Sequence, residues 1–374
     1  MNTDRTHHRH ADTADEPPVS DQIQLPWQYT VTPLLQRLRD GARLVHSAEI
    51  NRVAGLDWGI YQTPAYFFVA AGAESQPVIT RDGVVVNVAH DTLKLAGTRG
   101  PEAAAPAPNC FFNVRDDVHD VVGVVRRRYR VLQNADAPAF LDQLVDAGDG
   151  VFEAAAALHG GARVFWLMRL ENLGAGSETE RLDTYLLVEN SHDGSKSYCL
   201  STFAARPASQ ATLAWRLPSA PRALKLGRTA SASERRLISK RALELGAAYA
   251  RELAAIRDRM LRTSVSDERF RDFVGALIPT PKPIVARDRV TNQRGITMAT
   301  NAKGVITQLY HYNERLETIR GTLWGVVQAC EFYSNHLSIA RTTDDASRDE
   351  NRLKRLLTEA TLGGKAFAQA LEWL

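Results

Sequence analysis

The chain has 374 residues, of which 44% are hydrophobic and 24% are charged, and its formal net charge is +3. This composition excludes fibrous and wholly disordered proteins, and the length allows two or three domains. The three cysteines, Cys110, Cys199 and Cys330, are far apart and form no C-x-x-C pair, which argues against a disulfide framework or a zinc motif. The longest apolar runs are too short to cross a bilayer, so we expect a cytoplasmic protein.

The positive charge is concentrated in one segment. Residues 205–262 contain thirteen basic and four acidic residues, a balance of +9, so the rest of the chain carries −6. A basic segment of this kind is typical of a surface that attracts anionic partners. A solvated, arginine-rich helix face without a partner would have the same composition.

The first hundred residues predict few regular elements. Residues 1–26 are polar and aperiodic, which indicates a disordered tail. A helical pattern covers 29–54, strands are expected over 57–71 and 82–95, and the proline-rich stretch 97–109 is expected to be a loop.

The next hundred residues predict an antiparallel sheet with a short helix, because alternating apolar residues are separated by tight turns. Gly160-Gly161 and Asp193-Gly194 indicate hairpins, since these turns require positive φ. The expected strands cover 110–117, 120–133, 151–160, 162–170, 183–190 and 196–205, and the helix covers 135–148. We therefore expect an α+β domain over 27–220.

After Pro221 the sequence predicts helices alone. Ser231 and Glu234 form a capping box before a long amphipathic helix that runs to Met260. Residues 278–285 interrupt the helical pattern, and helices are expected again around 287–337 and 349–374. The predicted fold class is therefore α+β: an antiparallel sheet with packed helices, then an all-helical region over 221–374.

Common catalytic motifs are absent from the sequence. It has no phosphate-binding glycine loop, no H-E-x-x-H and no nucleophile elbow, which favours a non-enzymatic protein without a cofactor. One alternative remains open: Glu189, His192 and Asp193 could form the metal site of a nuclease or hydrolase, although a hairpin turn favours the same residue types.

The stretch 121–134, VVGVVRRRYRVLQN, carries the main functional hypothesis. If the strand continues to Gln133, then Arg126, Arg128 and Arg130 lie on one face, at a spacing close to that of phosphates on an extended strand. Arginine suits phosphate because its planar fork forms paired hydrogen bonds. A charged edge strand protected against aggregation is the competing interpretation. The candidate nucleic-acid-binding residues are Arg126, Arg127, Arg128, Tyr129, Arg130, Arg163, Trp166 and Lys196.

Several segments match a known family of proteins. They run in order from about residue 45 to the C-terminus and include AGLDWGIYQTPAYF, GVVRRRYRVLQNADAPAFLDQLVDAG and IRGTLWGVVQACEFYSNH. In these segments the chain resembles the phage/plasmid-like proteins that carry a domain of unknown function. The resemblance implies mobile-element biology but assigns no activity. A looser similarity, at the level of fold, links the chain to the single-strand annealing recombinases of phages.

We therefore expect a non-enzymatic DNA-binding protein of a mobile element that binds or anneals single-stranded DNA in recombination. Arg126, Arg128, Arg130, Arg163 and Lys196 would neutralise phosphates, and Tyr129 and Trp166 would stack on bases. The helical region would mediate formation of a homo-oligomer. A module that binds a host protein, with no affinity for DNA, is the main alternative.

Overall fold

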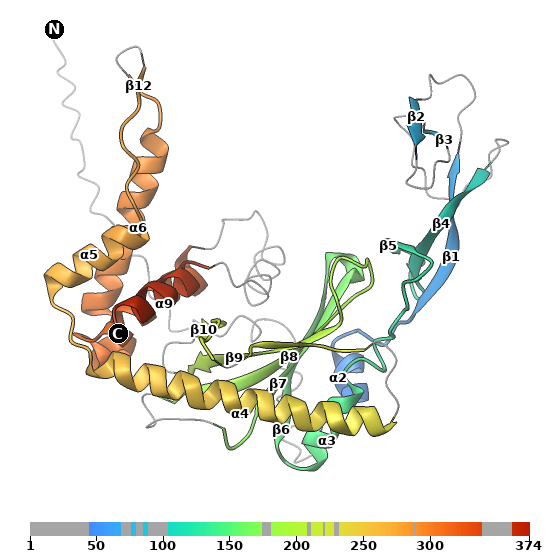
Figure 1. The fold of residues 1–374 in the computed structure, drawn as a ribbon, viewed down its shortest axis with the longest axis horizontal. Helices are drawn as coiled ribbons and strands as arrows, with labels where there is room; N and C mark the ends of the chain where they lie inside the picture. The colour runs from blue at the N-terminus through green and yellow to red at the C-terminus, as the bar shows by residue number, and fades with distance from the viewer. Residues whose placement is uncertain are drawn as a thin grey trace, which may run out of the picture.

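The structure is a computed structural model, and it describes residues 45–68, 76–79, 85–88, 104–173, 181–207, 211–219, 221–227, 232–286, 289–338 and 361–374. The predicted tail and most of the predicted 29–54 helix lie outside these ranges. Antiparallel sheets occupy the N-terminal half and helices dominate the C-terminal part, so the α+β prediction is confirmed (Figure 1).

The largest sheet is antiparallel throughout, and consecutive strands pair with one another. Its order is β10 (Ala211–Leu213), β9 (Cys199–Arg206), β8 (Asp183–Ser191), β7 (Arg163–Leu170) and β6 (Gly150–Leu158), and β11 (Ala223–Lys225) pairs with the other half of β9. Gly160, Gly161 and Gly194 have φ angles of 66°, 105° and 74° in the connecting turns, which confirms why glycine is needed there.

The two faces of this sheet are both apolar but pack into different clusters. On β7, Trp166 and Met168 belong to a cluster that also contains Ile50, Phe140, Leu186 and Leu200, called here the sheet–helix core. Phe165 and Leu167 point to the opposite face, the outer face, and pack with Tyr185, Leu187 and Phe203. Side chains alternate along a strand, so each strand supplies both faces.

A second sheet has the order β1 (Ile60–Phe68), β4 (Ala104–Arg115) and β5 (Val121–Arg126), and β2 (Gln76–Ile79) pairs with β3 (Val85–Val88) in a separate hairpin. The prediction of a loop over 97–109 is wrong for 104–109, which begin β4. Within the part of the chain that the structure describes, β5 pairs with Cys110–Val114 only, so the half of β4 before Cys110 has an open edge. An open edge tolerates Pro106 and Pro108, which cannot donate to a ladder.

Short helices cover the sheet–helix core from one side. They are α2 (Ser47–Val53), the 3-10 turn η2 (Ala139–Leu141) and α3 (Asp142–Asp146), and a further 3-10 turn, η3 (His159–Gly161), joins β6 to β7. Asn51 of α2 accepts a hydrogen bond from Trp166 Nε1 at 2.6 Å and donates to the carbonyl of Asn134 at 2.9 Å. These buried bonds fix α2 to the sheet.

The longest helix, α4 (Ala232–Arg262), joins the two halves of the molecule. Ala242 and Leu245 pack into the sheet–helix core. Tyr249, Leu253 and Met260 pack into a second cluster, the helical core, together with Trp215, Phe270, Trp324 and Phe367. Figure 1 shows α4 running below both the sheet and the C-terminal helices. One helix therefore contributes to both cores.

The remaining elements are mostly helical: α5 (Asp267–Leu277), α6 (Gln293–Tyr312), the 3-10 turn η6 (Glu314–Ile319), α7 (Leu323–Phe332), the π-turn η7 (Tyr333–Leu337) and α9 (Leu362–Glu372). The prediction that strands stop after Pro221 is wrong, because β11 follows it and β12 (Val285–Ala286) pairs with β13 (Arg289–Val290). No helix within the described ranges is long and apolar enough to cross a membrane.

The helical core buries one carboxyl group. Glu331 on α7 is 1% exposed; it accepts hydrogen bonds from Trp215 Nε1 and, at 2.8 Å, from Asn335 Nδ2. Burial raises the pKa of Glu331 from 4.5 to about 8, although both hydrogen bonds oppose this shift. A neutral carboxylic acid is therefore the stable form inside this core at pH 7.

Candidate nucleic-acid interface

The arginine-rich segment forms a turn rather than a continuous strand. β5 ends at Arg126, residues 127–128 form the turn, and the amide of Tyr129 donates to the Arg126 carbonyl at 2.8 Å. The prediction of a strand to Gln133 is therefore wrong, and so is the regular ladder of Arg126, Arg128 and Arg130. We call residues 126–130 the arginine turn.

The four arginines of this turn are exposed, whereas Tyr129 is half-buried. Arg126, Arg127 and Arg128 form no ion pair within the described ranges, so their charges face solvent. A turn concentrates the guanidinium groups at one projecting point, whereas a strand would have spread them along a line.

The arginine turn is fixed to the connection between β8 and β9. The hydroxyl of Tyr129 donates to the carbonyl of Ser191, and a Cβ at Gly194 would lie 3.7 Å from the Tyr129 ring. A Cβ at Gly123 would lie 2.3 Å from Cα of Asp193, so β5 also packs directly on this connection. Glycine at position 123 permits the approach, and the turn is held at the hairpin end of the large sheet.

Arg163 and Lys196 belong to the same end of the sheet, but they share one carboxylate. Lys196 Nζ lies 2.7 Å and 2.8 Å from the two oxygens of Glu189, and Arg163 Nη2 lies 3.8 Å from Oε1. The Glu189 side chain is 9% exposed, whereas those of Arg163 and Lys196 are 27% and 35% exposed. The cluster therefore carries a net charge of about +1, and the two cations are only partly available to phosphate.

Trp166 does not belong to an exposed interface. Its side chain is fully buried in the sheet–helix core, and Nε1 donates to Asn51. The prediction that Trp166 stacks on bases is wrong, because no face of the indole reaches solvent. Of the aromatic candidates, the half-buried Tyr129 alone lies beside the exposed arginines.

The residues of the metal-site alternative are held apart by different partners. Glu189 binds Lys196, His192 Nε2 lies 3.0 Å from Oδ1 of Asn134, and Asp193 accepts hydrogen bonds from Ser191 and, at 2.9 Å, from the Ser195 amide. The bonds of Asp193 lower its pKa although burial acts in the opposite direction. These residues shape the hairpin and do not converge on one point.

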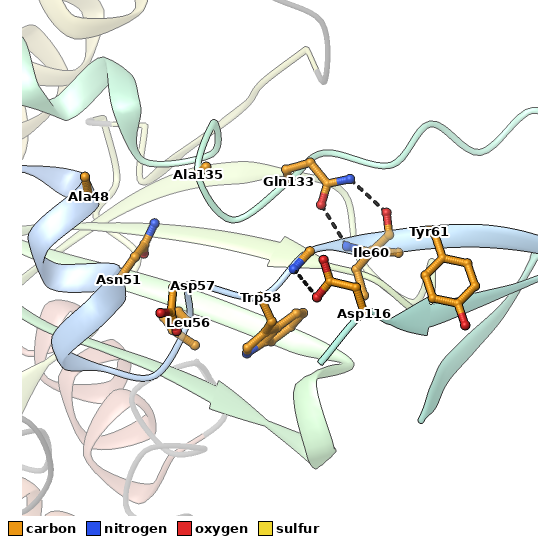
Figure 2. A pocket seen from close by; sticks show the side chains of 11 residues that line it. Ala48, Asn51, Leu56, Asp57, Trp58, Ile60, Tyr61, Asp116, Gln133 and Ala135 are labelled. Carbon is orange, nitrogen blue, oxygen red and sulfur yellow. Dashed lines mark hydrogen bonds between the residues drawn. The ribbon is translucent and has the colours of Figure 1, made fainter. Parts of the chain in front are cut away.

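A separate hollow of about 460 Å³ lies between α2, the start of β1 and the β4–β5 turn (Figure 2). The Gln133 side chain extends β1 like a strand partner: Oε1 accepts from the Ile60 amide and Nε2 donates to the Ile60 carbonyl, both at 2.8 Å. Asp116 accepts from the Gly59 amide at 2.8 Å. Asp57, Asp116 and Tyr61 are exposed, so the lining is acidic and aromatic.

One comparison with known proteins gives a match. The family described as a domain of unknown function, DUF932, matches residues 121–357, which is more than half of the chain. The chain belongs to the DUF932 family. No curated protein and no solved structure matches it.

The DUF932 match begins at the first residue of β5 and includes the arginine turn, the large sheet and α4 through α7. The matched residues therefore include the candidate interface, whereas the segment from α2 to the start of β1, which lines most of the hollow, precedes them. The hollow is not visible in the sequence because its lining residues come from three separated segments. The one signal is the aromatic and acidic run DWGIY at 57–61.

Proposed function

We propose that this DUF932 protein is a nucleic-acid-binding protein of a mobile element that binds or anneals single-stranded DNA during recombination, without cofactors and as a homo-oligomer. The observation that carries the proposal is the arginine turn, where four exposed guanidinium groups project within five residues and Arg126, Arg127 and Arg128 have no carboxylate partner among the described residues. Guanidinium groups bind phosphate through paired hydrogen bonds and release counterions.

The position of Tyr129 supports contact with bases as well as phosphates. Its hydroxyl is occupied by Ser191, so the ring is held at a constant orientation beside the arginines. Aromatic rings next to cations bind single strands without reading their sequence. Arg163 and Lys196 would add a weaker contact, because Glu189 already neutralises part of their charge.

Fluorescence anisotropy of a labelled oligothymidylate, titrated with the full chain across salt concentrations, tests the proposal. The variant is Arg126→Gln/Arg127→Gln/Arg128→Gln. Arg271→Gln/Lys282→Gln/Arg294→Gln, which removes the same charge from exposed positions on and near α5 and α6, is the control. We expect the turn variant to lose about two units of salt slope, at roughly 0.7 per phosphate contact. Equal losses in both variants, or no binding by the wild type at low salt, would contradict it.

A second candidate function is binding of a host protein, and the acidic, aromatic hollow favours it. Asp57 and Asp116 would attract a basic side chain, and the ring of Tyr61 offers a cation a second contact. Titration of a lysine- and arginine-rich peptide against wild type and Asp57→Asn/Asp116→Ala distinguishes the functions. Peptide binding that disappears in this variant, together with absence of oligonucleotide binding, would favour the host-protein module.

A further inference from the structure

α4 presents a second basic surface. The helix packs against the sheet–helix core and the helical core along most of its length. Its 31 residues correspond to about 46 Å. Buried residues from Ala242 to Met260 fix one side of the helix to the two cores. The opposite side of the helix faces solvent and is called here the α4 ridge.

Basic residues dominate this ridge. The exposed ones are Arg236, Lys240, Arg241, Arg251, Arg259 and Arg262, against the exposed acids Glu234 and Glu244. At 100° per residue the six fall within an arc of about 140° on the helix. Arg236, Arg241, Arg251 and Arg262 form no ion pair with any described residue, whereas Lys240 lies 4.0 Å from Glu244. The other two acids of α4, Glu252 and Asp258, bond to Ser219 and Arg257.

The α4 ridge and the arginine turn lie on different elements with different anchors: Tyr129 of the turn binds the Ser191 carbonyl at the end of β8, whereas Ala242 and Leu245 hold α4 on the sheet–helix core. α4 packs on the sheet face that contains Trp166, Leu186 and Leu200, whereas Glu189, with Arg163 and Lys196 bound to it, extends from the outer face. The thickness of one helix and one sheet, roughly 20 Å, therefore lies between the α4 ridge and the Glu189 cluster. In Figure 1, α4 runs along the lower edge, and β5, which ends in the arginine turn, lies at the upper right.

We propose that the solvent face of α4 is a second nucleic-acid-binding surface, which holds the phosphate backbone of another strand while the arginine turn holds the first. Each chain would then bridge two nucleic-acid segments. Bridging rests on the proposed function, because it needs the arginine turn; binding to α4 does not. Arg241, Arg251 and Arg262 span about 32 Å along the helix at intervals of roughly 16 Å, so each would contact a different, non-adjacent phosphate of one extended strand.

The test measures stoichiometry and bridging with the full chain. The probe is an oligothymidylate of about eight nucleotides, short for one basic groove and unable to pair with itself. Fluorescence titration at saturating concentration counts probes per chain, and capture of a dye-labelled probe by a bead-bound probe reports bridging. The α4 variant is Arg241→Gln/Arg251→Gln/Arg262→Gln; the turn variant and the α5–α6 control variant described above accompany it.

We expect two probes per wild-type chain, one per chain in the α4 variant and in the turn variant, and less bridging by both variants than by the wild type. The α5–α6 control variant should behave as wild type. One probe per wild-type chain would overturn the second surface and leave the arginine turn in place. Two probes per chain in the α4 variant would overturn it too, because the second probe would then be bound elsewhere. If the turn variant still binds two probes per chain, the arginine turn does not bind nucleic acid. The proposed function is then contradicted, and so is the bridging that rests on it.

Discussion

The hydroxyl of Tyr129 donates a hydrogen bond to the main-chain carbonyl of Ser191, a residue 62 positions away in the sequence. This bond joins the arginine turn to the end of β8, and β5 ends at Arg126, where the sequence pattern predicts a strand to Gln133. The arginines consequently project together from the hairpin end of the sheet.

Tyr129→Phe removes this bond and leaves every charge in place. We expect a loss of about 1 kcal/mol in the free energy of unfolding, because the Ser191 carbonyl loses its donor. Oligonucleotide affinity should also fall severalfold, since the turn is less well held. Denaturant titration and anisotropy measure the two effects. Tyr61→Phe, whose ring is 43% exposed, is the control and should change neither quantity.

Trp166→Phe separates a core role from a base-stacking role. The substitution leaves Asn51 Oδ1 without its donor inside the sheet–helix core, so we expect a loss of about 1–3 kcal/mol in stability. Affinity for an oligonucleotide, measured per folded molecule, should not change. A fall in affinity without a fall in stability would show that the indole contacts the ligand after all.

The stability of Glu331→Gln relative to the wild type should increase as the pH rises. The pKa of Glu331 is raised in the folded state to about 8. The neutral Glu331 side chain therefore contributes fully to the stability of the wild type below about pH 4.5, and this contribution is lost as the pH rises toward 8. The glutamine keeps the shape of the neutral acid and cannot ionise. Its amide nitrogen cannot accept one of the bonds from Trp215 and Asn335, so we expect the variant to be less stable by about 1 kcal/mol near pH 4 and more stable by about 2 kcal/mol at pH 7.

Urea titrations between pH 4 and pH 9 measure this difference. Glu244→Gln is the matched control, because it removes a carboxylate from the exposed side of α4. A constant difference between wild type and Glu331→Gln at all pH values would contradict the buried, neutral acid.

Gly363→Ala tests how closely α9 approaches the same carboxyl group. A Cβ at Gly363 would lie 2.0 Å from Oε2 of Glu331, so either the helix or the glutamate must move. We expect a loss of about 1–3 kcal/mol, typical of overpacking. Gly304→Ala on α6, where nothing lies within 4 Å of the added Cβ, should instead gain about 0.5–1 kcal/mol. Thermal unfolding of the two variants gives the comparison.

The local patterns in the sequence were sufficient for most of the large sheet. Alternation along β7 separates Trp166 from Phe165, and hairpin glycines such as Gly160 and Gly194 mark the turns, because strand period and turn chemistry depend on neighbouring residues. Pro106 and Pro108 misled the assignment of β4, since proline excludes a central strand but not an open edge, and which edge is open depends on strand order.

For the candidate site, the sequence by itself determined the charges: the arginines at 126–130 and the basic residues of 205–262 are visible without a fold. The tertiary structure decided which of them face solvent. It buries Trp166, pairs Lys196 with Glu189, turns the chain after Arg126, and puts the exposed side of α4 on the far side of the sheet from Arg163. The reason is physical: charge belongs to single residues, whereas burial, ion pairing and the face of a sheet arise from contacts between segments far apart in the chain.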